Sequence, residues 1–260
     1  MMKTSYRGRV SLLAGLACAM AWVIGATDLR ATPIALPASL VDALHRAEPF
    51  GGEARDISAG TLNDKWQELA RKLDDERVQL ALCDGDREHC VSPAALRFLA
   101  IVDQARAREG RARLGEINRA INLAIRPVSD LAQYGEEDVW SSPLATFSRG
   151  AGDCEDYAIA KVAALRLAGL AANDLRIVIL HDTLHREDHA VAAARLDGHW
   201  LVLDNQRMAM IEDADTRFVR PLFVFDDTGI AKYAETPMRV SAPEPLSGAS
   251  AAADMIATAD

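Results

Sequence analysis

The chain has 260 residues, of which 50% are hydrophobic, 26% are charged and 5% are aromatic. These proportions are those of a globular protein and exclude disordered, collagen-like and disulfide-scaffold chains. Because 38 Asp and Glu outnumber 29 Lys and Arg, the formal charge is −9, and most of the surface would repel a polyanion. We therefore expect no nucleic-acid partner.

Residues 1–26 have the layout of an export signal. Lys3, Arg7 and Arg9 precede an uncharged apolar stretch from Val10 to Ile24, and small residues follow it. A membrane span needs about 20 residues, so this stretch is slightly short, and an uncleaved inner-membrane anchor is the alternative. The segment is therefore predicted to be a signal peptide or such an anchor.

A helical lobe is expected next. Residues 27–60 are rich in Pro and Gly and are predicted to form a linker-like segment. Apolar residues recur at helical spacing over about 63–82, a serine cap followed by proline begins a second helix over about 92–110, and a third helix covers about 114–125. The apolar faces of these three helices are expected to pack into a core.

The second half of the chain changes to strands around one helix. Residues 158–167 form a short apolar helix, and 175–180 is a β-branched run typical of a buried strand. The two strand-like runs of 189–204 flank Asp197-Gly198, the strongest short-range signal for a β-hairpin. Residues 235–260 lack aromatic residues and are predicted to be a disordered tail. Helices followed by an antiparallel sheet predict an α+β fold.

The four cysteines differ in their surroundings. Cys18 lies inside the apolar part of the export signal, whereas Cys83 and Cys90 bracket a polar loop. We predict that Cys83 and Cys90 form a disulfide, the alternative being two unpaired thiols. In either case Cys154 is left over, which suggests a thiol kept free for chemistry.

Cys154 lies where a glycine-rich turn leads directly into a helix, in the sequence Gly150-Ala151-Gly152-Asp153-Cys154-Glu155-Asp156-Tyr157. Asp153 is placed to cap this helix, and Cys154 falls in its first turn, where unpaired N–H groups and the macrodipole favour a thiolate. The alternative is a buried structural cysteine. Because three carboxylates flank it, we predict that Cys154 is a nucleophile.

The hairpin supplies a base for this nucleophile. If Asp197-Gly198 is a two-residue turn, residue i of the first strand faces residue 395 − i of the second. His189 then faces Gln206, and Asp204 is its diagonal neighbour on the same face, within hydrogen-bonding reach. Alone, His189 is explained as a histidine at a strand end and Asp204 as an acid beside a turn. Together with Cys154 the three residues provide the nucleophile, the base and the orienting acid of acyl transfer.

These residues also carry a resemblance to a known family. From about residue 114 to 229 the chain resembles the bacterial transglutaminase-like cysteine proteinases, most specifically in the block around Cys154, in His189-Ala190-Val191 and in Leu203-Asp204-Asn205. Further matching positions are Asn118, Asn122, Asp130, Asp138, Trp140, Pro143 and Lys161.

The resemblance implies a papain/transglutaminase-like form of the α+β fold over residues 61–234. An N-terminal helical lobe and the nucleophile helix would pack on an antiparallel β-sheet. It also implies a catalytic triad of Cys154, His189 and Asp204. The chain departs from the family pattern at Ala145, where an acidic residue is common, and at Asp226, where Asn is common; the first difference bears on the positioning of substrate and not on catalysis.

The resemblance further implies a calcium site, because relatives of this kind bind Ca²⁺ beside the nucleophile. Asp153, Glu155 and Asp156 offer hard oxygen ligands, and the loop at Asn173 would add a backbone carbonyl. The alternative is that these acids only complement the macrodipole at the start of the helix.

The function that the resemblance implies is that of a periplasmic, calcium-dependent cysteine endopeptidase. Its substrate would be a large repeat adhesin, cleaved near the N-terminus to control biofilm attachment, and an inner-membrane cyclic di-GMP receptor would sequester it. A triad does not distinguish water from an amine as acceptor, so transglutaminase-type acyl transfer is one alternative. A non-catalytic periplasmic binding module is another.

Overall fold

The computed structural model describes residues 48–234, all of which belong to one of the two compact units of the chain, Ala38–Asp260. The predicted signal segment 1–26, the first part of the linker-like segment 27–60 and the predicted tail 235–260 lie outside the described residues. Among the residues that are described, no helix combines the length and the apolar character needed to cross a membrane.

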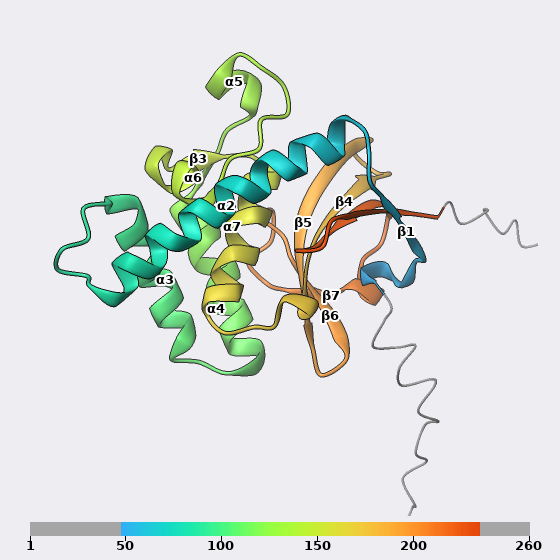
Figure 1. Cartoon of the computed structure of the whole chain (residues 1–260). Helices are drawn as coiled ribbons and strands as arrows, with labels where there is room; N and C mark the ends of the chain where they lie inside the picture. The colour runs from blue at the N-terminus through green and yellow to red at the C-terminus, as the bar shows by residue number, and fades with distance from the viewer. Residues whose placement is uncertain (1–47, 235–260) are drawn as a thin grey trace, which may run out of the picture. The chain divides into compact units, whose positions relative to one another are not determined.

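Six α-helices form in the described part of the chain and gather on one side of a sheet (Figure 1). They are α2 (Thr61–Gly85), α3 (Pro93–Arg106), α4 (Gly110–Ala124), α5 (Asp130–Tyr134), α6 (Pro143–Arg149) and α7 (Cys154–Leu167). The three helices predicted from apolar spacing correspond to α2, α3 and α4. The sequence did not predict α5 and α6, because five and seven residues are too few to show a periodic apolar face.

The sheet has seven antiparallel strands in the order β1-β9-β8-β4-β5-β6-β7. Their bounds are β1 (Ala54–Ile57), β4 (Leu175–Asp182), β5 (Glu187–Leu196), β6 (His199–Leu203), β7 (Ile211–Glu212), β8 (Val219–Phe225) and β9 (Ile230–Tyr233). The strand β1 falls inside the segment predicted to be linker-like and pairs with β9, so that prediction is wrong for these four residues. The predicted α+β fold class, with a helical lobe beside an antiparallel sheet, is confirmed.

The helix that begins at Cys154, α7, packs directly on the sheet. Ala192 and Ala194 of β5 point to the same side as the helices, and Ala160 and Ala164 of α7 meet them in the main core. Small side chains on both surfaces let the helix backbone approach the strand closely. The alternate residues of β5, such as Val191, belong to a smaller core on the other face of the sheet. This packing fixes α7 against β5.

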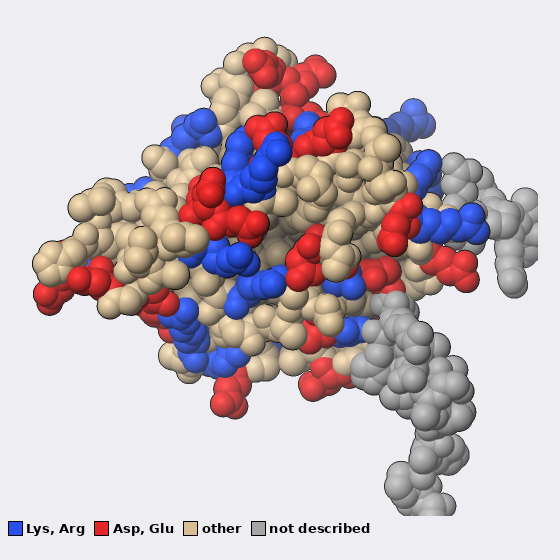
Figure 2. All heavy atoms as spheres, viewed as in Figure 1, with Lys and Arg blue, Asp and Glu red and all other residues tan. Residues whose placement is uncertain are grey.

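Charges of both signs are interspersed on the face of the molecule shown in Figure 2. Several are paired at the surface, as in Lys72 with Glu68 and Arg77 with Asp74, both on α2. Exposed pairs of this kind contribute little to stability. The face in view has no continuous basic surface.

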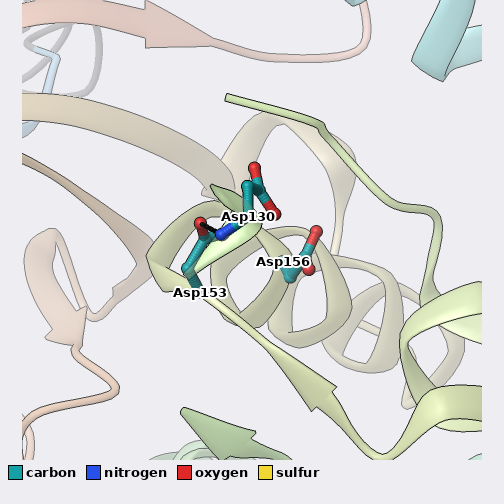
Figure 3. A group of neighbouring side chains, drawn as sticks. All are labelled: Asp130, Asp153 and Asp156. Atoms are coloured by element: carbon teal, nitrogen blue, oxygen red, sulfur yellow. Dashed lines mark hydrogen bonds between the residues drawn. The ribbon is translucent and has the colours of Figure 1, made fainter. Parts of the chain in front are cut away.

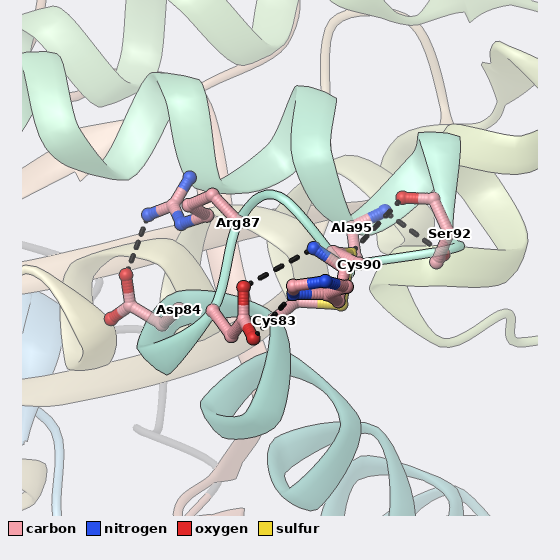
Figure 4. Close-up of a disulfide and its surroundings, with 8 residues drawn as sticks. Cys83, Asp84, Arg87, Cys90, Ser92 and Ala95 are labelled. Atoms are coloured by element: carbon pink, nitrogen blue, oxygen red, sulfur yellow. Dashed lines mark hydrogen bonds and ion pairs between the residues drawn. A yellow bond between two sulfur atoms is a disulfide. The ribbon is translucent and has the colours of Figure 1, made fainter.

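The predicted disulfide is confirmed. Cys83, near the end of α2, is bonded to Cys90 in the loop that leads to α3, with the two Cα atoms 4.8 Å apart (Figure 4). Arg87 of this loop donates a hydrogen bond of 2.5 Å to the carboxylate of Asp84 at the end of α2. The bond joins the last turns of α2 to the loop before α3 and leaves Cys154 as the free thiol of the described residues.

Replacing both bonded cysteines by serine is expected to lower the free energy of unfolding by about 2 kcal/mol, because a short loop loses its covalent closure. Chemical denaturation of the double variant and of the parent protein measures the difference. Equal stability would show that the loop is held by its ion pairs alone.

Candidate active site

The turn before α7 is shaped by glycine. A Cβ atom at Gly152 would lie 2.6 Å from Oδ2 of Asp156, so only glycine lets the chain pass this carboxylate. Gly150 ends α6 in the left-handed region, with φ at 66°, which also favours glycine. The two glycines thus allow α7 to begin at Cys154 directly after a sharp change of direction.

Cys154 is half-buried and lies between a carboxylate and a backbone amide. Its Sγ is 3.2 Å from Oε2 of Glu155, and the backbone N–H of Ala190 on β5 donates to the sulfur. Burial and the Glu155 carboxylate raise the pKa of the Cys154 thiol, and the Ala190 amide opposes them only in part. The helix start alone therefore does not favour a thiolate here, so the thiol needs a base.

His189 and Asp204 meet as the hairpin register requires. The strands pair from Ala192 with Leu203 to Leu196 with His199, which is the register expected for a two-residue turn. Because β6 ends at Leu203, Asp204 lies just beyond the last ladder pair, and its Oδ1 is 2.9 Å from Nε2 of His189.

Asp204 is held in its charged form. Burial raises its pKa, but the hydrogen bond and charge of His189, the Gln206 backbone N–H and the charge of Lys161 together lower it below its ordinary value. With Nε2 of His189 occupied by this carboxylate, Nδ1 is the nitrogen left to exchange a proton. Since the next residue, Ala190, contacts the Cys154 sulfur, the structure brings Cys154, His189 and Asp204 to one place.

Three further carboxylates converge beside the start of α7. Oxygens of Asp130, Asp153 and Asp156 all lie within 4.8 Å of one another and form the acidic cluster (Figure 3). A short parallel pairing brings them together. Strand β2 (Arg126–Pro127) pairs with β3 (Ala151–Gly152), which places α5 and its first residue, Asp130, beside the nucleophile helix.

Each carboxylate of the acidic cluster has one oxygen bonded and one free. The backbone N–H groups of Val139, Asp130 and Ser141 donate to Oδ2 of Asp130, Oδ2 of Asp153 and Oδ1 of Asp156, respectively. The second oxygens, Oδ1 of Asp130, Oδ1 of Asp153 and Oδ2 of Asp156, are buried and have no hydrogen-bond partner. Three buried, unpartnered hard oxygens close together fit the ligand set of a Ca²⁺ ion.

The proton affinities of the acidic cluster agree with this fit. Burial, together with the charges of neighbouring carboxylates, raises the pKa of Asp130 to about 6 and those of Asp153 and Asp156 to about 7. A divalent cation would relieve both the repulsion and the lost hydration.

The predicted metal ligands are only partly brought together. Asp153 and Asp156 belong to the cluster, and Asp153 does not cap α7 because its carboxylate is turned toward α5. Glu155 is not part of the cluster, but its carboxylate lies between the Cys154 sulfur, at 3.2 Å, and Asp153, with which it interacts. Asn173 is not among the residues of the acidic cluster: it lies in η2 (Ala172–Asp174) after the far end of α7, and a 14-residue helix is about 20 Å long.

Reasoning from the residues did not place Asp130 in the acidic cluster. It precedes Asp153 by 23 positions, and no local spacing connects the two. Two features of the sequence point to Asp130. It is one of the positions that match the family, and it lies shortly after a proline, where a short helix begins.

The ion-free protein is expected to lose stability as pH rises from about 5 to 8. An acid whose pKa is raised on folding binds its proton more tightly when folded, so its stabilising effect is complete below its unfolded pKa of about 4 and is lost as pH passes the folded value. Thermal unfolding in excess chelator should therefore give a lower Tm at pH 8 than at pH 5.5. Asp156→Asn should shrink this difference, and an equal or higher Tm at pH 8 would contradict the raised values.

Comparisons with known proteins agree with this arrangement. The sequence model of the family described as Bacterial transglutaminase-like cysteine proteinase BTLCP matches residues 79–221, more than half of the chain. No curated protein matches the chain significantly.

Solved structures share the fold. Legionella pneumophila LapG is similar with a TM-score of 0.50 and 20% identity, over 60% of this chain and 86% of that one. Its EGTA-treated form has a TM-score of 0.50 at 20% identity, over 61% and 85%. Its calcium-bound form has a TM-score of 0.48 at 21% identity, over 57% and 84%. With the family match covering both Cys154 and the His189–Asp204 pair, the chain belongs to the bacterial transglutaminase-like cysteine proteinases and is a cysteine peptidase.

Proposed function

We propose that the protein is an exported, calcium-dependent cysteine endopeptidase in which Cys154 is the nucleophile, His189 the base and Asp204 the orienting acid. The observation that carries this proposal is the hydrogen bond of 2.9 Å between His189 and Asp204 beside the Cys154 sulfur, which receives the N–H of Ala190. A histidine with one nitrogen fixed by a carboxylate presents the other to a thiol in a defined orientation.

The chemistry follows from these positions. Nδ1 of His189 takes the thiol proton, and Sγ of Cys154 attacks the carbonyl carbon of the scissile peptide bond. The tetrahedral intermediate then breaks its C–N bond as the imidazolium returns the proton to the leaving amine, and a thioacyl enzyme remains. Water, deprotonated by His189, cleaves the thioester and frees the thiol. N–H groups of the first turn of α7, which have no acceptor within the helix, are available to stabilise the oxyanion.

The acidic cluster is the proposed calcium site. Oδ1 of Asp130, Oδ1 of Asp153 and Oδ2 of Asp156 would hold the ion, because these are the buried oxygens without a partner. A bound Ca²⁺ would supply the positive charge that offsets the carboxylates around the nucleophile. Asp153 directly precedes Cys154, so fixing its carboxylate fixes the aim of the thiol.

The acceptor distinguishes hydrolysis from amine transfer. We expect that incubating the protein with a glutamine-containing peptide and a labelled primary amine gives no stable label on the peptide, while a cleavable protein substrate is still cut. The reason is that in the peptidase reaction water, and not the amine, attacks the thioester. Stable incorporation of label that requires Cys154 would instead support transglutaminase-type transfer.

The cellular role is proposed from the family resemblance. The protein would act in the periplasm, or from the inner membrane if its first segment is not cleaved, on a large repeat adhesin near its N-terminus. A cyclic di-GMP receptor of the inner membrane would sequester it and so control biofilm attachment. Deleting the gene should leave the adhesin on the cell surface, and purified protein should cut an N-terminal adhesin fragment. An adhesin that is released normally from the deletion strain would contradict this role.

A non-catalytic binding module is the remaining alternative. It predicts a Cys154 thiol that reacts no faster than a cysteine in a model peptide. The assembled His189–Asp204 pair has no purpose in such a module, so the peptidase is the better supported function.

A further inference from the structure

A buried lysine lies behind the proposed triad. Lys161 is on α7, seven residues after Cys154, and its side chain is 0% exposed. Its Nζ donates to the backbone carbonyl of Leu203, the last residue of β6, at 3.2 Å. The ring of Tyr157, one turn earlier on the helix, lies 5.8 Å from the same nitrogen. None of the catalytic steps described above uses this amino group.

Burying a charged lysine among apolar side chains has a free-energy cost. Its neighbours on α7 include the buried residues Ala158, Ala160, Ala164 and Leu165. Burial lowers the pKa of Lys161 to about 7, and the charge of Asp204 opposes this change. A methionine of similar length would fill the same space without the loss of hydration. The packing of the core therefore gives no reason for a cation here, whereas the nearby Asp204 does.

We propose that Lys161 is a positioning residue for the His189–Asp204 pair, holding the Leu203 carbonyl at the end of β6 and favouring the ionised Asp204 carboxylate. This inference rests on the proposed role of the triad. Lys161 acts from the nucleophile helix, so it ties the position of Asp204 to the element that carries Cys154.

A second contact fixes the same short segment from another helix. Nδ2 of Asn122 on α4 donates to the backbone carbonyl of Asp204 at 2.9 Å and to that of Arg207 at 3.0 Å. The peptide groups on the two sides of the Asp204 Cα atom are thus held by α7 and by α4. Asn122 is neutral, so the two contacts differ in one respect that can be tested: only Lys161 adds charge.

The charge has a defined electrostatic consequence. The groups that face Lys161 or its partner are Tyr157 from its own helix, Asp204 after β6 and, through Asp204, His189 from β5. Arg207 also faces Asp204, with its Nε 3.9 Å from Oδ2 of the carboxylate, and it is unchanged in every Lys161 variant. Removing a cation from this group makes the imidazolium of His189 easier to form, so the pKa of His189 should rise. Loss of packing alone would not produce that rise.

The test compares three variants of the calcium-loaded full chain. Lys161→Met removes the charge and the hydrogen bond, Lys161→Gln keeps a donor for the Leu203 carbonyl without the charge, and Arg166→Met is the matched control. Arg166 is a cation of the same helix, half-exposed and paired with Asp227 at 3.3 Å. The readouts are kcat, KM, the pH profile of kcat/KM and the NMR titration of His189.

We expect Lys161→Met to lower kcat at pH 7 about 10-fold or more, with KM changed less than about 2-fold, because substrate binding is untouched. The pKa of His189 should rise by about half a unit or more in both Lys161 variants, since each removes the same charge. Lys161→Gln should retain more of kcat than Lys161→Met, and Arg166→Met should change neither readout. An unchanged His189 titration and kcat in Lys161→Met, with only a lower Tm, would overturn the proposal.

The titrations keep this test separate from the proposed function. If the wild-type protein cleaved no substrate, the proposed function would fail, but the shift of the His189 titration would still support or overturn the role of Lys161. If neither Lys161 variant folded, the amino group of Lys161 would be titrated by NMR in the wild type and in Asp204→Asn. Removing the Asp204 charge should lower the pKa of Lys161, and an unchanged value would overturn the proposal.

Discussion

Replacing Cys154 by alanine is expected to abolish peptide-bond cleavage, lowering kcat/KM by a factor on the order of 10⁴ or more. The thioester cannot form without the sulfur, and what remains is the small effect of binding and of oxyanion stabilisation. Cys154 is only half-buried, so losing one sulfur atom should cost about 1 kcal/mol of stability. Cleavage of a protein substrate, followed by electrophoresis and mass spectrometry, measures the effect.

The matched control for this prediction is the serine double variant at Cys83 and Cys90, which removes two sulfur atoms far from the site and should keep full activity. Circular dichroism of Cys154→Ala should match that of the wild type, which excludes unfolding as the cause of inactivity. A folded Cys154→Ala protein that still cleaves its substrate would remove the thiol from the mechanism.

Chelating calcium is expected to lower kcat/KM about 100-fold, because a nucleophile displaced by about 1 Å loses rate by about that factor. Asp153 precedes Cys154 directly, and its second oxygen belongs to the acidic cluster, so release of the ion should disturb the start of α7. Added Ca²⁺ should restore activity, whereas Mg²⁺ should do so only weakly, since it demands an octahedral site and gives up its water reluctantly.

The variant that tests this site is Asp156→Asn. The amide oxygen of asparagine still accepts the Ser141 N–H, which is bonded to Asp156 at 2.8 Å, so the fold is retained while a charged ligand is lost. Glu137→Gln is the matched control, because Glu137 is an exposed acid of the same region. We expect Asp156→Asn to behave like the chelated enzyme and Glu137→Gln like the wild type. Full activity of Asp156→Asn in excess chelator would show that the acidic cluster holds no functional ion.

The pH dependence of calcium binding follows from the same carboxyls. The pKa values of Asp153 and Asp156 are raised to about 7, so each holds a proton below that pH when no ion is bound. Calcium must displace these protons, so its affinity should fall as pH decreases from 8 to 6. Isothermal titration in two buffers of different ionisation enthalpy measures both the affinity and the protons released.

The parts of the fold that the sequence predicted are those with a repeating or local signal. Helical spacing of apolar residues located α2, α3 and α4, and Asp197-Gly198 fixed the register of the β5–β6 hairpin. That register was sufficient to place Asp204 beside His189, because one turn determines every pair along the two strands. The sequence therefore predicts those residues of the site that a single local element, such as a hairpin, positions.

The parts that were not predicted depend on contacts between distant segments. Asp130 reaches Asp153 through the pairing of two two-residue strands, which no apolar pattern indicates. β1 joins the sheet through β9, about 175 residues further along the chain, and only the folded sheet edge specifies that contact. Asn173, which the resemblance offered as a ligand, lies in η2 after α7, and no local signal in the sequence places that loop relative to the start of the helix.

The rate of alkylation of Cys154 tests most directly whether His189 and Asp204 activate the thiol. Burial and Glu155 raise the pKa of this thiol, so fast reaction near neutral pH requires the imidazolium of His189 as its partner. In the calcium-loaded protein, iodoacetamide should modify Cys154 at pH 7 about 10-fold or more faster than a cysteine in a model peptide, and His189→Ala should abolish this advantage. A wild-type rate no higher than that of the model peptide, or an equal rate in His189→Ala, would contradict the account.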